Sequence, residues 1–333
     1  MSIKAIAAEL ELSVSTVSRA LNDYPDISPR TKRRVVKEAK RQGYQLKPTS
    51  GAQWLQAKRV ITAIVSGQDG TFLDPTLSRV LAGVRKALQA HDYLLQVVVI
   101  DAGPTELSEF ERLIKAGDQE GFLVLRTRTN DPKVKRLLKL NVPFVCYGRT
   151  EQAQHFAWLD LDNQRMGKLA VEALVQQGVS HTNIAVVTVA GRYFFAKERL
   201  NGVTNTLERL GASLEPEQLL EVPFDEEQGY LSCAEFLLAQ PNIKGLVCLT
   251  STCAKAAALA AMRVYGASHD IKVVGCDTPI DELNTSMGVA CIQQAPPLKV
   301  GEQLAEMMIK RIQGTPVKSL QCVLLPSVVT PHF

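Results

Sequence analysis

From Arg59 onward, short apolar runs rich in β-branched residues alternate with amphipathic stretches of helical spacing. Eight runs are expected to be strands, at 60–65, 94–100, 121–125, 143–147, 183–189, 245–249, 271–275 and 322–326. Seven stretches are expected to be helices, at 76–90, 107–116, 164–177, 196–210, 228–239, 253–265 and 297–312. This alternation is typical of parallel sheets with helices on both faces. Because so many units exceed one open sheet, we expect an α/β fold with two doubly wound lobes and a ligand cleft between their strand C-termini.

The N-terminal segment has a different pattern, in which apolar residues follow helical spacing throughout. Three apolar stripes lie at 3–10, 14–21 and 27–39. Ser13 and Ser28 stand where N-caps belong, Ser13 directly before the second stripe and Ser28 near the start of the third. The pattern predicts a small bundle of three short helices.

The positive charge of the chain is concentrated in the same segment. Residues 1–60 carry 12 Lys and Arg against 5 Asp and Glu, a net charge of +7. The whole chain has 38 against 34, which leaves 26 against 29 and a net charge of −3 for the rest. A basic N-terminal module suits a phosphate backbone, although charge alone also fits a solvated basic face.

The second predicted helix begins in the run LSVSTVSRALN at 12–22. Its leading side chains are small enough to let the backbone approach a major groove, and Arg19 lies one turn further on, where it can reach a base edge or a phosphate. Hydroxyl groups and the cations of the third helix can hold phosphates. The candidate DNA-binding residues in this run are Ser13, Val14, Ser15, Thr16, Ser18, Arg19 and Asn22.

The pattern SxxTVSRxLN, followed by xxxxISxxTxxRV and GY, resembles the headpiece signature of the LacI/GalR family of bacterial repressors. The resemblance continues through 158–187, 197–203, 273–277 and 292–294, and it covers essentially the whole chain. One departure is Glu11, which occupies a turn position where the family often has glycine, so the turn must close without that glycine.

The resemblance implies a helix-turn-helix headpiece at 1–46, a hinge at 47–58, and an effector-binding and dimerisation core at 59–333 with a periplasmic-binding-protein-like fold. Within the core, it implies one lobe at about 59–160 plus 293–321 and another at about 161–292 plus the C-terminal strand. It further implies a homodimer on double-stranded operator DNA, with Leu55 of the hinge as a wedge in the minor groove. The expected function is a repressor of sugar-utilisation genes whose operator affinity changes when a small molecule, expected to be a sugar, enters the interlobe cleft.

Five residues are candidates for binding the effector. Arg199 and Asp277 match the family's arginine and aspartate that hold effector hydroxyls, although Arg199 also fits an interlobe salt bridge. Arg149 follows a predicted strand at its C-terminal end and is otherwise a solvated loop residue. Phe194 fits stacking on a sugar ring or ordinary lobe packing. Asp162 is the last candidate, although its position favours the capping of a helix.

Other classes of protein fit the sequence less well. A periplasmic-type sugar-binding protein would share the two lobes, but it needs a secretory signal, and the first residues hold no apolar run of that kind. An enzyme is not indicated, because the sequence contains no HExxH, no GxSxG, no Walker loop and no GxGxxG that follows a strand. The seven cysteines form no CxxC pair. We therefore expect a cytoplasmic protein without catalysis, cofactor, metal or membrane segment. Induction and corepression are not distinguished, and induction is expected for a sugar.

Overall fold

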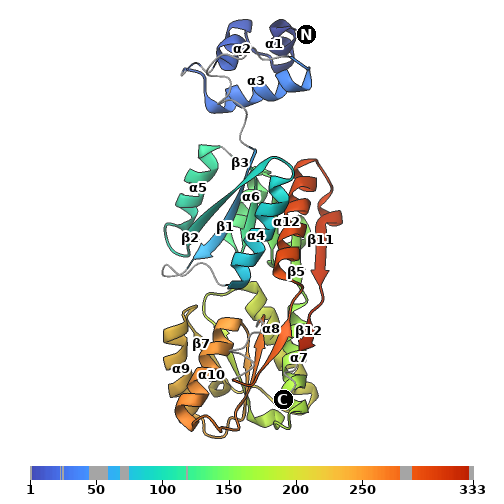
Figure 1. Ribbon diagram of the computed structural model, residues 1–333. Helices are drawn as coiled ribbons and strands as arrows, with labels where there is room; N and C mark the ends of the chain where they lie inside the picture. The colour runs from blue at the N-terminus through green and yellow to red at the C-terminus, as the bar shows by residue number, and fades with distance from the viewer. Residues whose placement is uncertain are drawn as a thin grey trace.

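In the computed structural model, the described residues are 2–22, 24, 26–44, 59–67, 75–117, 119–277 and 287–329. Figure 1 shows a helical headpiece, a first lobe and a second lobe that follow one another from top to bottom. The predicted hinge at 47–58, with Leu55, lies outside the described residues.

The headpiece contains three helices, α1 (Ile3–Leu10), α2 (Val14–Leu21) and α3 (Pro29–Arg41). Both predicted N-caps are confirmed, because Ser13 Oγ accepts a hydrogen bond from Thr16 N at 3.0 Å and Ser28 Oγ accepts one from Thr31 N at 3.1 Å. Glu11 itself takes the left-handed conformation that ends α1, with φ 55°. The small core consists of Ile6, Ala7, Val17, Ala20, Leu21, Val35, Val36 and Ala39.

The first lobe is built on a six-stranded sheet of order β11-β5-β4-β3-β1-β2, in which every pairing is parallel. Its strands are β1 (Arg59–Gly67), β2 (Tyr93–Asp101), β3 (Gln119–Leu125), β4 (Phe144–Tyr147), β5 (Ala157–Leu161) and β11 (Gln321–Leu324). Its helices are α4 (Pro75–Gln89), α5 (Glu106–Ala116), α6 (Pro132–Leu140) and α12 (Pro297–Ile312). Because α4 and α12 share one apolar core with the sheet and α5 and α6 share another, helices cover both faces.

The second lobe has a sheet of order β12-β10-β9-β8-β6-β7, parallel except for the antiparallel strand β12. Its strands are β6 (Ile184–Val189), β7 (Leu219–Val222), β8 (Gly245–Cys248), β9 (Lys272–Cys276), β10 (Val289–Gln293) and β12 (Ser327–Val329). Its helices are α7 (Asn163–Gln176), α8 (Phe194–Arg209), α9 (Glu226–Ala239) and α10 (Ser251–Tyr265). Here α9 and α10 cover one face, and α7 and α8 cover the other. Short 3-10 helices lie at Ala153–His155, His181–Asn183, Pro216–Gln218 and Val317–Leu320.

The chain crosses between the lobes three times, after β5, after β10 and after β11. All eight predicted strands and seven predicted core helices overlap an observed element, and the predicted helix at 297–312 has the bounds of α12. The structure differs at the C-terminus: β11 belongs to the sheet of the first lobe, and only β12 completes that of the second. Five observed elements have no predicted counterpart, because their segments are short or mix apolar and polar residues without a clear period. They are α6, β5, β7, β10 and β12.

Each lobe contains one pair of helices whose backbones meet at glycines. In α4 and α12, a Cβ at Gly83 would collide with the Leu298 carbonyl, and one at Gly301 would collide with the Val80 carbonyl. In α7 and α8, a Cβ at Gly202 would collide with the Gln164 carbonyl. The glycine contact between α7 and α8 therefore sets how closely α8, which carries Arg199, approaches the start of α7.

Candidate effector site and DNA-binding surface

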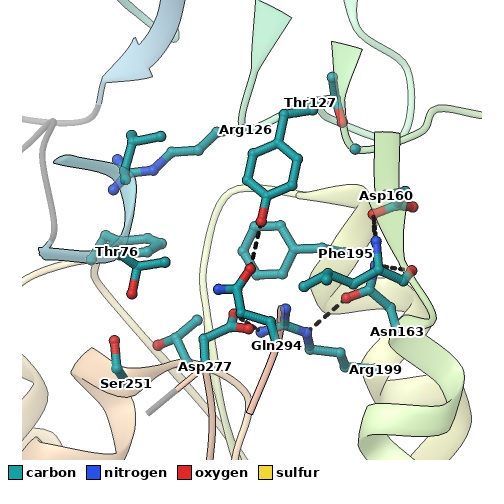
Figure 2. Close-up of a pocket in the computed structure, with 16 residues that line it drawn as sticks. Thr76, Arg126, Thr127, Asp160, Asn163, Phe195, Arg199, Ser251, Asp277 and Gln294 are labelled. Atoms are coloured by element: carbon teal, nitrogen blue, oxygen red, sulfur yellow. Dashed lines mark hydrogen bonds and ion pairs between the residues drawn. The ribbon is translucent and has the colours of Figure 1, made fainter. Parts of the chain in front are cut away.

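A cleft lies between the two lobes at the C-terminal ends of their parallel strands, where ligands bind in doubly wound folds. Its empty volume, including space open to solvent, is about 720 Å³. Figure 2 shows side chains from both lobes pointing into it. The lining residues are Thr76, Leu77, Arg126, Thr127, Tyr147, Gly148, Asp160, Leu161, Asn163, Phe195, Arg199, Phe224, Thr250, Ser251, Asp277 and Gln294.

Arg199 is the most buried charged residue of the cleft, with 2% of its surface exposed. Its Nη1 lies 2.6 Å from Asp277 Oδ2, and its Nε donates to Asn163 Oδ1 at 2.9 Å (Figure 2). Nη1 also donates to the Leu249 carbonyl at 2.6 Å. The guanidinium also lies 4.9 Å from the centre of the Phe195 ring. Burial lowers the pKa of Arg199 and the charge of Asp277 raises it, with a net upward shift, so the guanidinium stays charged.

Two charged residues of the cleft have a left-handed backbone. Asp277 follows β9 with φ 58°, and Arg126 follows β3 with φ 53°. The Arg126 guanidinium lies 4.4 Å from the centre of the Phe224 ring, so it reaches from the first lobe to the second. Such backbone strain in non-glycine residues concentrates at functional sites, where the surrounding structure holds it in place.

Asp160 connects the two lobes through its hydrogen bonds. Its carboxylate accepts from Arg149 Nε at 2.7 Å, from Leu161 N at 2.8 Å and from Asn163 Nδ2 at 3.0 Å. Burial raises the pKa of Asp160, and the adjacent Arg149 opposes that rise. Because Asn163 also accepts from Arg199, one polar chain runs from β5 of the first lobe to Asp277 at the end of β9 in the second.

Aromatic rings and an amide complete the cleft walls. The Tyr147 hydroxyl donates to Gln294 Oε1 at 2.6 Å, which joins the end of β4 to the segment between β10 and α12. The rings of Phe195 and Phe224 also line the cleft. Paired donors and acceptors beside aromatic faces can hold a neutral molecule with several hydroxyl groups.

Two of the five sequence-predicted effector residues, Arg199 and Asp277, line the cleft. Their ion pair lies within the second lobe, so it is no interlobe bridge. The other three, Arg149, Asp162 and Phe194, are not among the lining residues. Asp162 caps α7 by accepting a hydrogen bond from Arg165 N at 3.0 Å. Arg149 donates to the Asp160 carboxylate, and its guanidinium lies 5.8 Å from the centre of the Phe194 ring.

Sequence reasoning missed several lining residues, among them Arg126, Tyr147, Asn163 and Gln294. Arg126 and Tyr147 lie at the ends of predicted strands, and that position was a usable signal. Asn163 and Gln294 sit in stretches that carried the family resemblance, but nothing local marks their side chains as facing a cleft.

The predicted DNA-binding residues lie along α2 and the turn before it. Ser13, Val14, Ser15 and Arg19 are exposed, and Thr16 and Ser18 are half-buried. Arg19 Nη2 forms an ion pair with Asp26 Oδ2 at 2.8 Å, and the Asp26 hydrogen bond raises the pKa of Arg19. Asn22 is exposed, but its Nδ2 donates to the Ser18 carbonyl at 2.8 Å, which caps the C-terminal end of α2.

Three features of the described residues bear on other kinds of site. Among those residues, no group of three or more His, Cys, Asp or Glu side chains is arranged to hold a metal ion. In the same ranges, no helix has the length and apolar character needed to cross a membrane. The seven cysteines are free thiols, and all but the half-buried Cys322 are buried.

A helix-turn-helix headpiece joined to two doubly wound lobes, with a cleft of charged, amide and aromatic side chains between them, defines a ligand-responsive DNA-binding protein. The family model described as "Periplasmic binding proteins and sugar binding domain of LacI family" matches residues 58–324. The chain belongs to the LacI family, and it is a transcriptional regulator.

Full-length relatives agree with this membership. The chain is 28% identical to the HTH-type transcriptional regulator RafR of Escherichia coli over 331 residues, which covers 98% of this chain and 96% of RafR. It is 26% identical to the HTH-type transcriptional regulator CelR of Thermobifida fusca, covering 97% and 95%. A solved CelR–cellobiose complex has the same fold, with a TM-score of 0.70 at 23% identity over 99% of this chain and 98% of that one.

Proposed function

We propose that the chain is a repressor of sugar-utilisation genes and that a sugar in the interlobe cleft changes its affinity for operator DNA. The observation that carries this proposal is the ion pair between the buried Arg199 and the half-buried Asp277, 2.6 Å apart, beside the Phe195 ring. A guanidinium and a carboxylate suit vicinal hydroxyl groups, and an aromatic face suits the apolar face of a sugar ring. The full-length similarity to CelR, which has been solved with cellobiose, supports the same class of effector.

In this proposal, Arg199, Asp277 and Asn163 hold sugar hydroxyls, while Phe195 and Phe224 pack against the ring. Arg149 acts indirectly, because it holds the Asp160 carboxylate that also accepts from Asn163. Sugar binding favours one mutual position of the lobes and thereby shifts the population of headpieces that fit the operator. Induction is the expected sign of the response.

For operator recognition, we propose that Val14, Ser15 and Arg19 face bases, while Ser13, Thr16, Ser18 and the cations of α3 hold phosphates. Asn22 supports the end of α2. Leu55 remains the sequence-based candidate for the minor-groove wedge. We also propose that the protein acts in the cytoplasm, where operator DNA lies, and carries out no catalysis. RafR and CelR, both named as transcriptional regulators, support this.

We further propose a homodimer, in which two headpieces read two half-sites. Edge strand β2 exposes Leu94 and Val97, with exposed fractions of 56% and 41%. In the second lobe, α9 exposes Leu231 and Leu238, seven residues apart on one helix face, with exposed fractions of 54% and 68%. Figure 1 draws β2 and α9 on the same side of the molecule, so a second copy can cover both patches together.

The test combines ligand binding with operator release. Wild-type protein is screened by thermal shift against sugars that include cellobiose, sugar phosphates and nucleobases, and the stabilising compounds are then added to a gel-shift assay with DNA from the gene's own promoter region. We expect a sugar to raise the melting temperature and to release the DNA. A protein that never retards promoter DNA, or one stabilised only by non-sugar compounds, would contradict the proposal.

A further inference from the structure

The two lobes meet in a main-chain seam beside the cleft, formed by segments 127–129 and 192–194. Thr129 N donates to the Arg192 carbonyl at 3.1 Å, and Phe194 N donates to the Thr127 carbonyl at 3.1 Å. Between these bonds, Arg128 and Tyr193 pair as an isolated antiparallel bridge. Arg192 has φ 57°, a left-handed conformation that is uncommon for a residue with a side chain.

Both segments of the seam adjoin residues of the effector cleft. Thr127 lines the cleft at the end of β3, and Phe194 starts α8, the helix that carries Phe195 and Arg199 into the cleft. Opening the seam therefore separates cleft residues of the first lobe from those of the second. Unlike the three chain crossings, the seam has no covalent continuity between the lobes and is held by hydrogen bonds and side-chain packing.

A buried charge network holds the half of the seam that belongs to the first lobe. Lys133 is fully buried, and its Nζ lies 2.5 Å from Glu106 Oε1 and 3.0 Å from Ser66 Oγ. The other carboxylate oxygen of Glu106 accepts from the Arg128 guanidinium. Asp131 is also buried, and it accepts from the Arg128 main-chain N at 3.2 Å and from Lys133 N at 3.0 Å.

The network therefore fixes both the main chain and the side chain of Arg128, the central residue of the seam. The Arg128 guanidinium pairs with Glu106 through Nη2. Its Nε is buried and has no hydrogen-bond partner among the described residues, so the position of the guanidinium depends strongly on Glu106. Burying several charges together is costly, and removing one partner leaves another charge uncompensated. A cluster of this kind gives little net stability, but it strongly favours one local arrangement.

From the second lobe, Tyr193 is packed against this network. It is 4% exposed and stacks on Phe195 at 5.5 Å between ring centres. Burial raises the pKa of Tyr193, and the charges of Arg126, Arg128 and Glu106 also act on its hydroxyl, those of the arginines lowering the pKa and that of Glu106 raising it. The charge network in the first lobe is thus close enough to act on a residue of the second.

We propose that segments 127–129 and 192–194 form a latch between the lobes and that Glu106, through Arg128, sets how tightly the latch closes. Glu106 and Lys133 do not line the cleft, so they act as positioning residues. That the latch affects sugar affinity rests on the proposed function, whereas the existence of the latch does not. A loosened latch leaves fewer molecules in the arrangement that brings both walls of the cleft together.

The test measures amide hydrogen exchange in the effector-free, full-length protein. Glu106→Gln keeps the size of the side chain and removes its charge. We expect the amides of Thr129 and Phe194 to exchange about tenfold faster, as for loss of one charge-assisted hydrogen bond. Val124, in the centre of β3, reports on the first lobe as a whole and should keep its protection.

Glu109→Gln is the matched control, because Glu109 lies in the same first turn of α5 and belongs to no ion pair of the network. It should leave exchange at Thr129 and Phe194 unchanged. Arg128→Gln, in a side chain that is 19% exposed, is the second variant and should fold even if Glu106→Gln does not. It should accelerate the same two amides.

Unchanged exchange at Thr129 and Phe194 in a folded variant would overturn the latch, as would equal acceleration at Val124, which indicates a general loss of stability. Because no sugar is present, the outcome is independent of whether the cleft binds one. Failure of the sugar screen would leave the latch result standing, and failure of the latch would leave the sugar screen standing.

Discussion

Arg199 occupies the buried side of α8, where an unpaired guanidinium would be very costly. Asp277, Asn163 and the Leu249 carbonyl together compensate its charge and use most of its donors. A bound molecule must therefore interact with an ion pair that already exists. This arrangement keeps both charged side chains oriented before the ligand arrives, which lowers the entropy cost of binding.

Asp277→Asn removes the countercharge of Arg199 and leaves the size of the side chain unchanged. We expect the free energy of unfolding to fall by about 3 kcal/mol, as when one partner of a buried pair is lost. The sugar response in thermal shift and gel shift should disappear, while affinity for operator DNA without sugar stays the same. Asp162→Asn is the control, since asparagine also caps a helix and Asp162 does not line the cleft. A normal dose response in Asp277→Asn would remove Asp277 from the site.

Arg19 is the residue of α2 that we propose reads a base, and in the free protein its guanidinium pairs with Asp26. Arg19→Ala should weaken operator binding by about 1–3 kcal/mol and weaken binding to random DNA much less. Competition gel shifts measure both affinities. The control is Lys37→Ala, an exposed cation on α3 that should affect both DNAs equally and slightly. Equal losses for Arg19→Ala on both DNAs would show that Arg19 contacts phosphate only.

At the scale of elements, paired helices that meet at glycines determine where the cleft residues lie. The α7–α8 pair holds Asn163 on one helix and Arg199 on the other, and Gly202 allows the two backbones to come close enough for their 2.9 Å hydrogen bond. Gly202→Ala places a Cβ against the Gln164 carbonyl, so α8 must move away.

We expect Gly202→Ala to cost about 1–3 kcal/mol of stability, as overpacking does, and to weaken the sugar response. Chemical denaturation and thermal shift with sugar measure the two effects. Gly103→Ala is the control, because a Cβ at Gly103 has no atom within 4 Å. Unchanged stability and sugar affinity in Gly202→Ala would mean that α7 and α8 tolerate a wider spacing.

At the scale of the whole molecule, the exposed apolar side chains of β2 and α9 lie at comparable edges of the two lobes. If a second copy covers them, the relative position of the lobes and the spacing of the two headpieces become linked. The interlobe latch and the dimer contacts would then both fix the relative position of the two lobes. In this proposal, a sugar in the cleft changes that position and thereby the spacing of the headpieces on DNA.

Leu238→Glu introduces a charge at the most exposed leucine of α9. We expect the dissociation constant of the dimer to rise by about tenfold or more, with a monomer visible in sedimentation velocity and weaker operator binding. Leu140→Glu, at the end of α6 with an exposed fraction of 39%, is the control and should remain dimeric. A wild-type chain that sediments as a monomer at operator-binding concentrations would contradict the proposed dimer.

The sequence by itself indicated most of the helices and strands, because helical and strand spacing and N-caps such as Ser13 depend on neighbours along the chain. It also indicated Arg199 and Asp277, through their place in motifs of the family. Only the tertiary structure decided that Asn163 and Gln294 enter the cleft and that Glu106 lies beneath the seam. These contacts join residues far apart in the chain, and they depend on which strand ends lie side by side and how two lobes meet, which no local pattern encodes.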